Sequence, residues 1–308
     1  MILILSDRQD TTVRRVLPKI ERLGVPVTWW DSGEFPARSR VTAVFAGGSR
    51  RLTLDTGAQV VDLATVTAVW NLRPNRSVAA ANVSDPTHRA HVEWQSRFHL
   101  DGVWEIVRAR WLPCPHPVTG RTRNRLVHTA LAAELGFAVP ETVYTNDPAE
   151  LVPAYERAGG RLLVNLLDPE DLRIDGQDHR VHSTLVRRRH LASRHRLQHE
   201  PVILQPCLPR AVDLRAVVVG DRVFAVRVGE RPGDGPGDFA VHRLPEEVER
   251  RCAALAASLG LSYAVVHLAL TGEGEHVFLE IDPNGAWAPV EESTGLPVSD
   301  AIAAWLAA

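Results

Sequence analysis

Residues 278–287 read FLEIDPNGAW, and their apolar start predicts a buried strand that ends in a polar turn. Glu280, Asp282 and Asn284 alternate along this stretch, so the twofold repeat of a strand places them on one face. Three oxygen-bearing side chains at a strand end suit a hard cation such as Mg²⁺. The run Asp-Pro-Asn-Gly also favours an Asx-type turn without an ion, and the residues alone leave both interpretations open.

The strand before this motif carries a histidine. Residues 262–270, SYAVVHLAL, predict a buried strand, and a turn at 271–275 joins it to the motif. Antiparallel pairing through that turn sets His267 near residues 278–280, beside Glu280. A lone histidine in an apolar strand is more often a hydrogen-bonded core residue, so His267 has either that role or a place beside the acidic site.

A predicted hairpin precedes both strands. LRAVVV and RVFAVRV flank a turn at Gly220-Asp221 within residues 214–228. Arg215, at the start of this hairpin, can hold a phosphate or a carboxylate through two parallel hydrogen bonds. Its alternative role is a surface ion pair, which contributes little to stability.

The first third of the chain alternates short apolar strands with helical or polar segments. Strands are predicted at residues 1–5, 25–30, 42–47, 50–55 and 67–74. A helix is predicted over residues 11–23, where Val13, Val16 and Ile20 recur at helical spacing. Strand–helix–strand order predicts a small α/β domain with some parallel pairing.

Residues 111–124, WLPCPHPVTGRTRN, hold three prolines and a glycine, so we expect a domain boundary without regular structure there. The remaining helices are predicted at residues 87–110, 125–135 and 245–259, and from about Ser299 onward. The remaining strands are predicted at residues 139–145, 161–167 and 201–208. The composition of residues 229–238 predicts a mobile loop.

Composition excludes several classes of protein. The 308 residues carry 35 Lys plus Arg against 37 Asp plus Glu, a net charge of -2 that favours neither nucleic acid nor an anionic membrane as partner. No apolar run approaches the ~20 residues of a membrane helix. Cys114, Cys207 and Cys252 lie too far apart for a zinc motif, and we expect a reducing cytoplasm. Lys19 is the only lysine.

One segment is strongly basic. Residues 179–199 contain six arginines and five histidines. A solvated face is the simpler interpretation of such a run. The functional interpretation is a surface for phosphate or acidic side chains, and in that case Arg187, Arg188 and Arg189 are the expected peptide contacts.

Several segments together resemble one known family. They are MILILSDRQDTTVRRV (1–16), VWNLRP (69–74), NRLVHTALAAELGFAVPETVYTNDP (124–148), LQPCLPRAVDLRAVVVGDRVFA (204–225) and FLEIDPNGAWAPVEESTGLPVSDAI (278–302). The chain resembles the ATP-grasp ligases that mature ribosomal peptides, the graspetide or microviridin-type macrocyclases. The resemblance implies an α/β ATP-grasp fold with a pre-ATP-grasp domain at 1–118, a central subdomain at 119–200 and a C-terminal subdomain at 201–308.

The resemblance also implies a reaction and its ligands. ATP phosphorylates an acidic side chain of a precursor peptide, and a hydroxyl or amine then attacks to give an ester or amide. The implied cofactors are ATP and Mg²⁺, with Mn²⁺ as an alternative; the implied partners are the precursor peptide and either a second copy or a partner ligase. The implied site is catalytic Arg215, nucleotide-binding Arg125, Asn165, Gln205, Pro206, Cys207 and Leu208, and metal-binding His267, Glu280, Asp282 and Asn284.

This chain departs from the family's pattern at five positions. Arg125 and Asn165 stand where the family has lysines, and a neutral amide cannot neutralise phosphate. His267 replaces an acidic ligand, Asp282 replaces an asparagine, and Ala240 replaces an arginine. Imidazole suits Mn²⁺ or Zn²⁺ better than Mg²⁺. Three hypotheses follow: an active macrocyclase, a pseudo-ligase that binds peptide or a partner, and a ligase for a small-molecule carboxylate.

Overall fold

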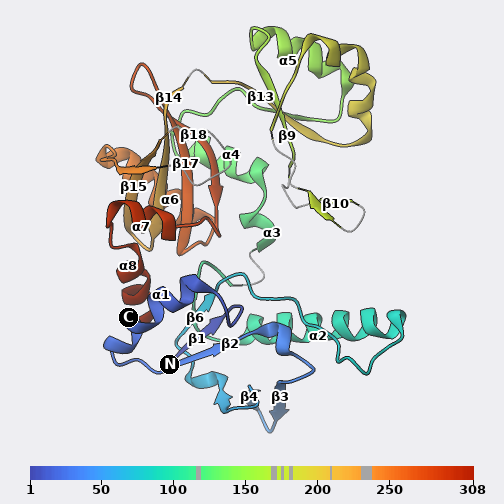
Figure 1. Ribbon diagram of the computed structural model, residues 1–308, viewed down its shortest axis with the longest axis vertical. Helices are drawn as coiled ribbons and strands as arrows, with labels where there is room; N and C mark the ends of the chain where they lie inside the picture. Colours follow the sequence, from blue (N-terminus) through green and yellow to red (C-terminus); the bar gives the residue numbers. More distant parts are fainter. Residues whose placement is uncertain (116–118, 168–171, 175–176, 180–182, 209, 230–237) are drawn as a thin grey trace.

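The computed structural model describes residues 1–115, 119–167, 172–174, 177–179, 183–208, 210–229 and 238–308. Figure 1 shows a lower body that begins at the N-terminus, a body above it that ends at the C-terminus, and a smaller body at the upper right. They are called the first domain, the C-terminal lobe and the central lobe below. In the described part of the chain, no helix is long and apolar enough to span a bilayer.

A parallel sheet forms the core of the first domain, in the strand order β2-β1-β6-β7. Its strands are β1 (Ile2–Leu5), β2 (Val27–Trp30), β6 (Ala68–Asn71) and β7 (Arg110–Leu112). Every residue of β1 is buried because helix α1 (Thr11–Arg22) covers one face and helix α2 (Pro86–Ile106) covers the other. The predicted α/β domain with parallel pairing is thereby confirmed.

A second, antiparallel sheet packs on the α2 side of the first domain. It consists of β3 (Arg40–Ala46), β4 (Ser49–Asp55) and β5 (Val60–Asp62), with the short helices η1 (Ser32–Glu34) and η2 (Leu63–Thr65) nearby. Leu52 and Leu54 of β4 share a core cluster with Leu100 of α2, which ties the two sheets into one domain.

Helix α1 joins the first domain to the C-terminal lobe. Asp10 caps the helix by accepting hydrogen bonds from the backbone N–H groups of Thr12 and Val13. The single lysine, Lys19, donates from Nζ to Ser299 Oγ at 2.6 Å and to Asp300 Oδ2 at 2.9 Å. Both acceptors lie at the start of α8 (Val298–Ala307), which packs along α1.

Five antiparallel strands form the C-terminal lobe, in the order β16-β15-β14-β17-β18. They are β14 (Arg210–Val219), β15 (Arg222–Val228), β16 (Phe239–Val241), β17 (Tyr263–Thr271) and β18 (His276–Asp282). Helices α4 (Arg125–Glu134) and α6 (Glu246–Ser258) cover one face, whereas α7 (Ala288–Thr294) and α8 cover the other. The predicted hairpin at residues 214–228 is confirmed, since Val219 pairs with Arg222 across its turn.

The central lobe holds a smaller sheet in the order β12-β9-β13-β8. Its strands are β8 (Val143–Thr145), β9 (Leu162–Asn165), β12 (Thr184–Leu185) and β13 (Val202–Pro206). One core cluster joins this sheet to α5 (Leu151–Arg157) and η5 (Arg188–His199), and η4 (Pro148–Glu150) precedes α5. A hairpin of β10 (Leu172–Ile174) and β11 (Gln177–His179) projects from the lobe (Figure 1).

The proline-rich boundary differs from the sequence expectation. We expected no regular structure at residues 111–124, but β7 extends to Leu112, and α3 (Thr119–Thr122) forms a helical turn. Backbone pairing of β7 with β6 ends where Pro113 begins, because proline has no N–H to continue a ladder. Most of the expected mobile loop at 229–238 lies outside the described residues.

Candidate active site

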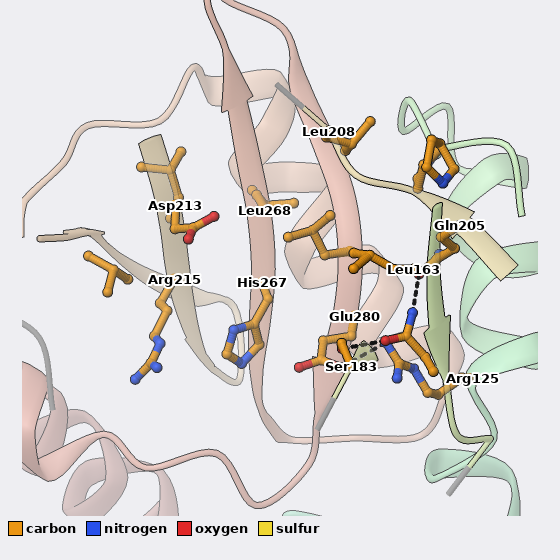
Figure 2. Close-up of a pocket in the computed structure, with 16 residues that line it drawn as sticks. Arg125, Leu163, Ser183, Gln205, Leu208, Asp213, Arg215, His267, Leu268 and Glu280 are labelled. Atoms are coloured by element: carbon orange, nitrogen blue, oxygen red, sulfur yellow. Dashed lines mark hydrogen bonds and ion pairs between the residues drawn. The ribbon is translucent and has the colours of Figure 1, made fainter. Parts of the chain in front are cut away.

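A cavity of about 270 Å³ lies between the central sheet and the C-terminal sheet (Figure 2). Strands β9 and β13 form one wall, strands β14, β17 and β18 form the floor, and the first turn of α4 contributes a side chain. Its lining residues are Arg125, Pro140, Leu163, Asn165, Ser183, Gln205, Pro206, Leu208, Asp213, Leu214, Arg215, Val228, His267, Leu268, Leu279 and Glu280.

Three polar side chains lie in a row across the floor. Arg215 on β14 is the register partner of His267 on β17, and His267 is in turn the partner of Glu280 on β18. The expectation that pairing would place His267 beside Glu280 is therefore confirmed. Burial lowers the pKa of His267; the Glu280 carboxylate opposes that shift and the Arg215 guanidinium adds to it. The imidazole is consequently neutral near pH 7 and keeps a lone pair for a ligand.

Arg125 closes the end of this row. Its Nη2 atom lies 3.1 Å from Glu280 Oε2, and the two side chains are 20% and 41% exposed. Asn124 fixes the start of α4 by accepting hydrogen bonds from the N–H groups of Leu126 and Val127, which places Arg125 in the first helical turn. An arginine from α4 and a carboxylate from β18 thus meet at the cavity.

The opposite wall consists of neutral hydrogen-bonding groups. Asn165 is 6% exposed; its Nδ2 donates to Gln205 Oε1 at 3.1 Å, and its Oδ1 accepts from the Ser183 hydroxyl. Gln205 Nε2 donates to Thr142 Oγ1 at 2.9 Å, and that hydroxyl donates to the Pro140 carbonyl. The hydrogen-bonded side chains of Ser183, Asn165, Gln205 and Thr142 are called the neutral relay below, and Figure 2 labels Ser183 and Gln205 among them. Both the nitrogen and the oxygen of the Asn165 side-chain amide are therefore hydrogen-bonded.

The acidic motif forms the expected Asx turn. Asp282 Oδ1 accepts the backbone N–H of Asn284 at 2.8 Å. Asp282 is the register partner of Val265, two residues along β17 from His267. In the described residues, no three histidine, cysteine or acidic side chains form a complete metal cage. The two carboxylates fit Mg²⁺, which prefers oxygen ligands and completes its shell with phosphate oxygens and water, whereas the imidazole fits Mn²⁺ better.

The structure places the predicted site residues in three groups. Eight of them line the cavity together: Arg125, Asn165, Gln205, Pro206, Leu208, Arg215, His267 and Glu280. A second group lies outside the described lining: Asp282 ends β18 and Asn284 follows it on the turn, while the Cys207 N–H bonds to the Arg161 carbonyl at 2.6 Å. Arg187, Arg188 and Arg189 are exposed at the start of η5, outside the cavity lining.

Sequence reasoning missed three polar residues of the site. Thr142 and Ser183 form the two ends of the neutral relay, and no local pattern around either residue indicated a polar contact at the site. Asp213 lines the floor two residues before Arg215, and its position at the start of the predicted hairpin was the available signal.

Comparison with known proteins agrees with this architecture. Residues 1–116 match the family model of the MvdD pre-ATP-grasp domain. Macrocyclase MdnB from Microcystis aeruginosa MRC is 29% identical, covers 99% of this chain and 98% of its own, and has a TM-score of 0.83. A RiPP-associated ATP-grasp ligase from Chryseobacterium gregarium, solved with ADP and with a leader and core peptide, is 22% identical, with a TM-score of 0.90 and coverage of 99% and 96%.

A curated relative matches over a shorter stretch. The probable alpha-L-glutamate ligase 2 of Shewanella frigidimarina is 26% identical over 194 residues, which is 59% of this chain and 63% of the relative. The match therefore spans less than two thirds of that protein. The chain therefore has the ATP-grasp fold of these solved ligases, and its residues 1–116 match the MvdD pre-ATP-grasp domain.

Proposed function

We propose that the chain is an ATP-dependent ligase that forms side-chain ester or amide crosslinks in a ribosomally made precursor peptide. The observation that carries the proposal is the row Arg215–His267–Glu280, with Arg125 at its end, on the floor of a cavity between two sheets. Cations beside carboxylates on one rigid surface suit phosphoryl transfer, in which positioning and charge stabilisation supply most of the catalysis.

The proposed reaction has two steps. A carboxylate oxygen of the peptide bonds to the γ-phosphorus of ATP as the bond from that phosphorus to the β-phosphate oxygen breaks, and ADP leaves. A hydroxyl or amine of the same peptide then attacks the acyl carbon, loses its proton, and displaces inorganic phosphate. Each crosslink therefore consumes one ATP and removes one water from the peptide.

The chain's own residues take distinct roles in this scheme. Arg215 faces the cavity from a strand centre and stabilises the negative charge on the acyl phosphate. Arg125 contacts the ATP phosphates, while the neutral relay and the segment Gln205–Leu208 hold the base. His267, Glu280 and Asp282, with Asn284 beside them, would hold Mg²⁺ or Mn²⁺, which neutralises phosphate charge when bound.

The substrate is proposed to be a peptide. Two solved structures with this fold are complexes with such peptides: macrocyclase MdnC bound with precursor peptide MdnA, and the Chryseobacterium gregarium ligase with a leader and core peptide. Arg187, Arg188 and Arg189 are exposed cations on the central lobe and are the proposed contacts for acidic peptide side chains. The alpha-L-glutamate ligase relative favours the alternative of a small-molecule carboxylate.

One observation favours a second candidate, a pseudo-ligase that binds peptide without turnover. Asn165 stands where the resembled family has a lysine, and it is committed to the neutral relay. A hydrogen bond to a charged group is worth roughly 1.5–3 kcal/mol, so loss of this cation weakens phosphate binding. Arg125, the nearby cation, is meanwhile paired with Glu280.

Mass spectrometry of the peptide distinguishes the candidates. The purified chain is incubated with MgATP and with a candidate precursor peptide that carries acidic, hydroxyl and amine side chains. The ligase predicts loss of one water per crosslink and equal release of phosphate, both abolished in Arg215→Ala. Peptide binding without mass change in either Mg²⁺ or Mn²⁺ is the outcome that the pseudo-ligase predicts.

A further inference from the structure

We propose that the Arg125–Glu280 ion pair is a resting contact that couples nucleotide binding to cation binding. In the free chain, Arg125, which is proposed to bind phosphate, and Glu280, which is proposed to bind the metal, neutralise each other's charge. A nucleotide that draws Arg125 away frees Glu280 for a cation, and a cation on Glu280 frees Arg125 for phosphate. This inference rests on the proposed function and concerns the regulation of the same site.

The contact itself is direct. Arg125 Nη2 and Glu280 Oε2 are 3.1 Å apart, and Figure 2 shows both side chains at the same end of the cavity. The arginine side chain is only 20% exposed, so water screens the pair less than it screens a surface pair. Both residues line the cavity, and a bound phosphate or cation therefore has to compete for them.

Rigid supports hold both partners in place. Arg125 is in the first turn of α4, where its carbonyl accepts the Thr129 hydroxyl at 3.0 Å and Thr129 in turn bonds to Tyr144 at 2.9 Å. Glu280 lies on β18, paired in register with His267. The pair therefore forms between two preset positions, and breaking it needs only side-chain rotation.

The other side chains of the cavity do not offer a substitute for Arg125. Arg125 and Arg215 are the two arginines among the described lining residues, and the Arg215 guanidinium lies 5.2 Å from the ring centroid of Phe239. Asn165 is neutral and committed to the relay. Arg215 is proposed for the acyl phosphate, so occupancy of the Arg125–Glu280 pair sets how much of the Arg125 charge the free site offers to the nucleotide phosphates.

The competition predicts a change in anion affinity opposite to the one expected when a site loses a ligand. Loss of a proposed metal ligand should strengthen the binding of a metal-free anion, because Arg125 is released. The apparent affinity for the anion equals the intrinsic affinity multiplied by the fraction of molecules in which Arg125 is unpaired. A pair that is formed most of the time therefore lowers this affinity. Removal of Glu280 should then raise affinity by roughly threefold to fivefold.

The test is a double-mutant cycle with ADP as the probe, measured by calorimetry in EDTA. The cycle compares the wild type, Glu280→Gln, Arg125→Gln and the double variant. Glu280→Ala repeats the removal of the charge with a side chain that cannot hydrogen-bond to Arg125. Glu273→Gln removes the same charge on an exposed turn and is the matched control. Thermal unfolding of each variant confirms that it is folded.

We expect Glu280→Gln to bind ADP roughly threefold to fivefold more tightly than wild type, and the same change to have no effect when Arg125 is already absent. A gain that persists without Arg125 is a general charge effect and overturns the inference, as does the absence of any gain. In both of those cases wild-type ADP binding leaves the proposed function standing. If no form binds ADP even with Mg²⁺ or Mn²⁺ added, the inference and the proposed function both fail.

Discussion

Gly285 lies directly against Val265, at the point where the acidic motif leaves β18. A Cβ atom at position 285 would lie 2.5 Å from Val265 Cγ2 and 2.6 Å from Val265 Cβ, closer than packed atoms approach. The Gly285 carbonyl also accepts the buried hydroxyl of Tyr263. The turn that carries Asp282 and Asn284 is therefore held against β17 by a contact that only glycine permits.

Gly285→Ala should lower the free energy of unfolding by about 1–3 kcal/mol, because the added methyl group overpacks a buried contact. Urea unfolding followed by tryptophan fluorescence measures the change. Gly102→Ala is the matched control, since that glycine lies within α2 with no atom within 4 Å of an added Cβ. It should raise stability by about 0.5–1 kcal/mol. Equal effects of the two substitutions would count against the Val265 contact.

Substitutions at different members of the neutral relay should lower the free energy of unfolding by different amounts. Asn165→Leu removes a buried amide and leaves Gln205 Oε1 without its donor, which should destabilise the chain by about 1–3 kcal/mol. Ser183→Ala should cost less, because Ser183 is exposed and water can replace its hydroxyl. Chemical denaturation of both variants checks the order, and a larger loss for Ser183→Ala would contradict it.

Lys19 predicts a stabilising contact between the first domain and the C-terminal lobe. Its amine bonds to Ser299 and Asp300 and lies 3.8 Å from Glu291, with the side chain 21% exposed. Lys19→Met should lower the free energy of unfolding by about 1–2 kcal/mol, since it leaves a partly buried acidic cluster without its cation. Arg22→Met, on an exposed part of the same helix, should change stability by less than about 0.5 kcal/mol. Similar losses in the two variants would mean that the contact contributes nothing specific.

His128 predicts a pH dependence of stability. It is 2% exposed, its Nε2 donates to the Thr122 carbonyl at 2.8 Å, and its Nδ1 has no partner among the described groups. Burial lowers the pKa of His128 below its ordinary value of 6.5, so the unfolded chain binds more protons. Stability is therefore present above pH 6.5 and is lost as pH falls below it toward the lowered pKa.

Unfolding measured from pH 7.5 to pH 5 should show this slope, and His128→Asn should reduce it by up to about 1.4 kcal/mol per pH unit. His88→Gln, an exposed histidine on α2, serves as the control and should leave the slope unchanged. An unchanged slope in His128→Asn would show that another group, such as half-buried His267, causes the dependence.

The floor of the site could be predicted from the sequence because its residues share two adjacent strands. A short turn between β17 and β18 determines the pairing, so counting residues places His267 close to residues 278–280. Regular pairing would set it opposite Leu279, and an irregularity between His267 and Leu268 shifts its partner to Glu280. The Asx turn at Asp282 likewise depends on neighbours in the sequence. Local periodicity also predicted α1, whose Val13, Val16 and Ile20 are buried.

The remainder depends on contacts between distant segments, which leave no local pattern. Arg125 meets Glu280, and Asn165 meets Gln205, only because two sheets close around one cavity. Strand β7 was missed because three prolines dominate residues 111–124, yet a three-residue edge strand needs few free N–H groups. Thr142 and Ser183 were missed because their hydrogen-bond partners, Gln205 and Asn165, belong to other segments of the chain.

Calorimetric titration of the purified chain with ATP, first with Mg²⁺ and then with Mn²⁺, tests the central claim most directly. The account predicts one nucleotide site whose affinity falls by about tenfold in EDTA but stays measurable there, with weaker binding in Arg125→Gln and in Asn284→Ala. No heat at millimolar ATP with either metal, even with the precursor peptide present, would contradict an ATP-dependent ligase and favour the pseudo-ligase.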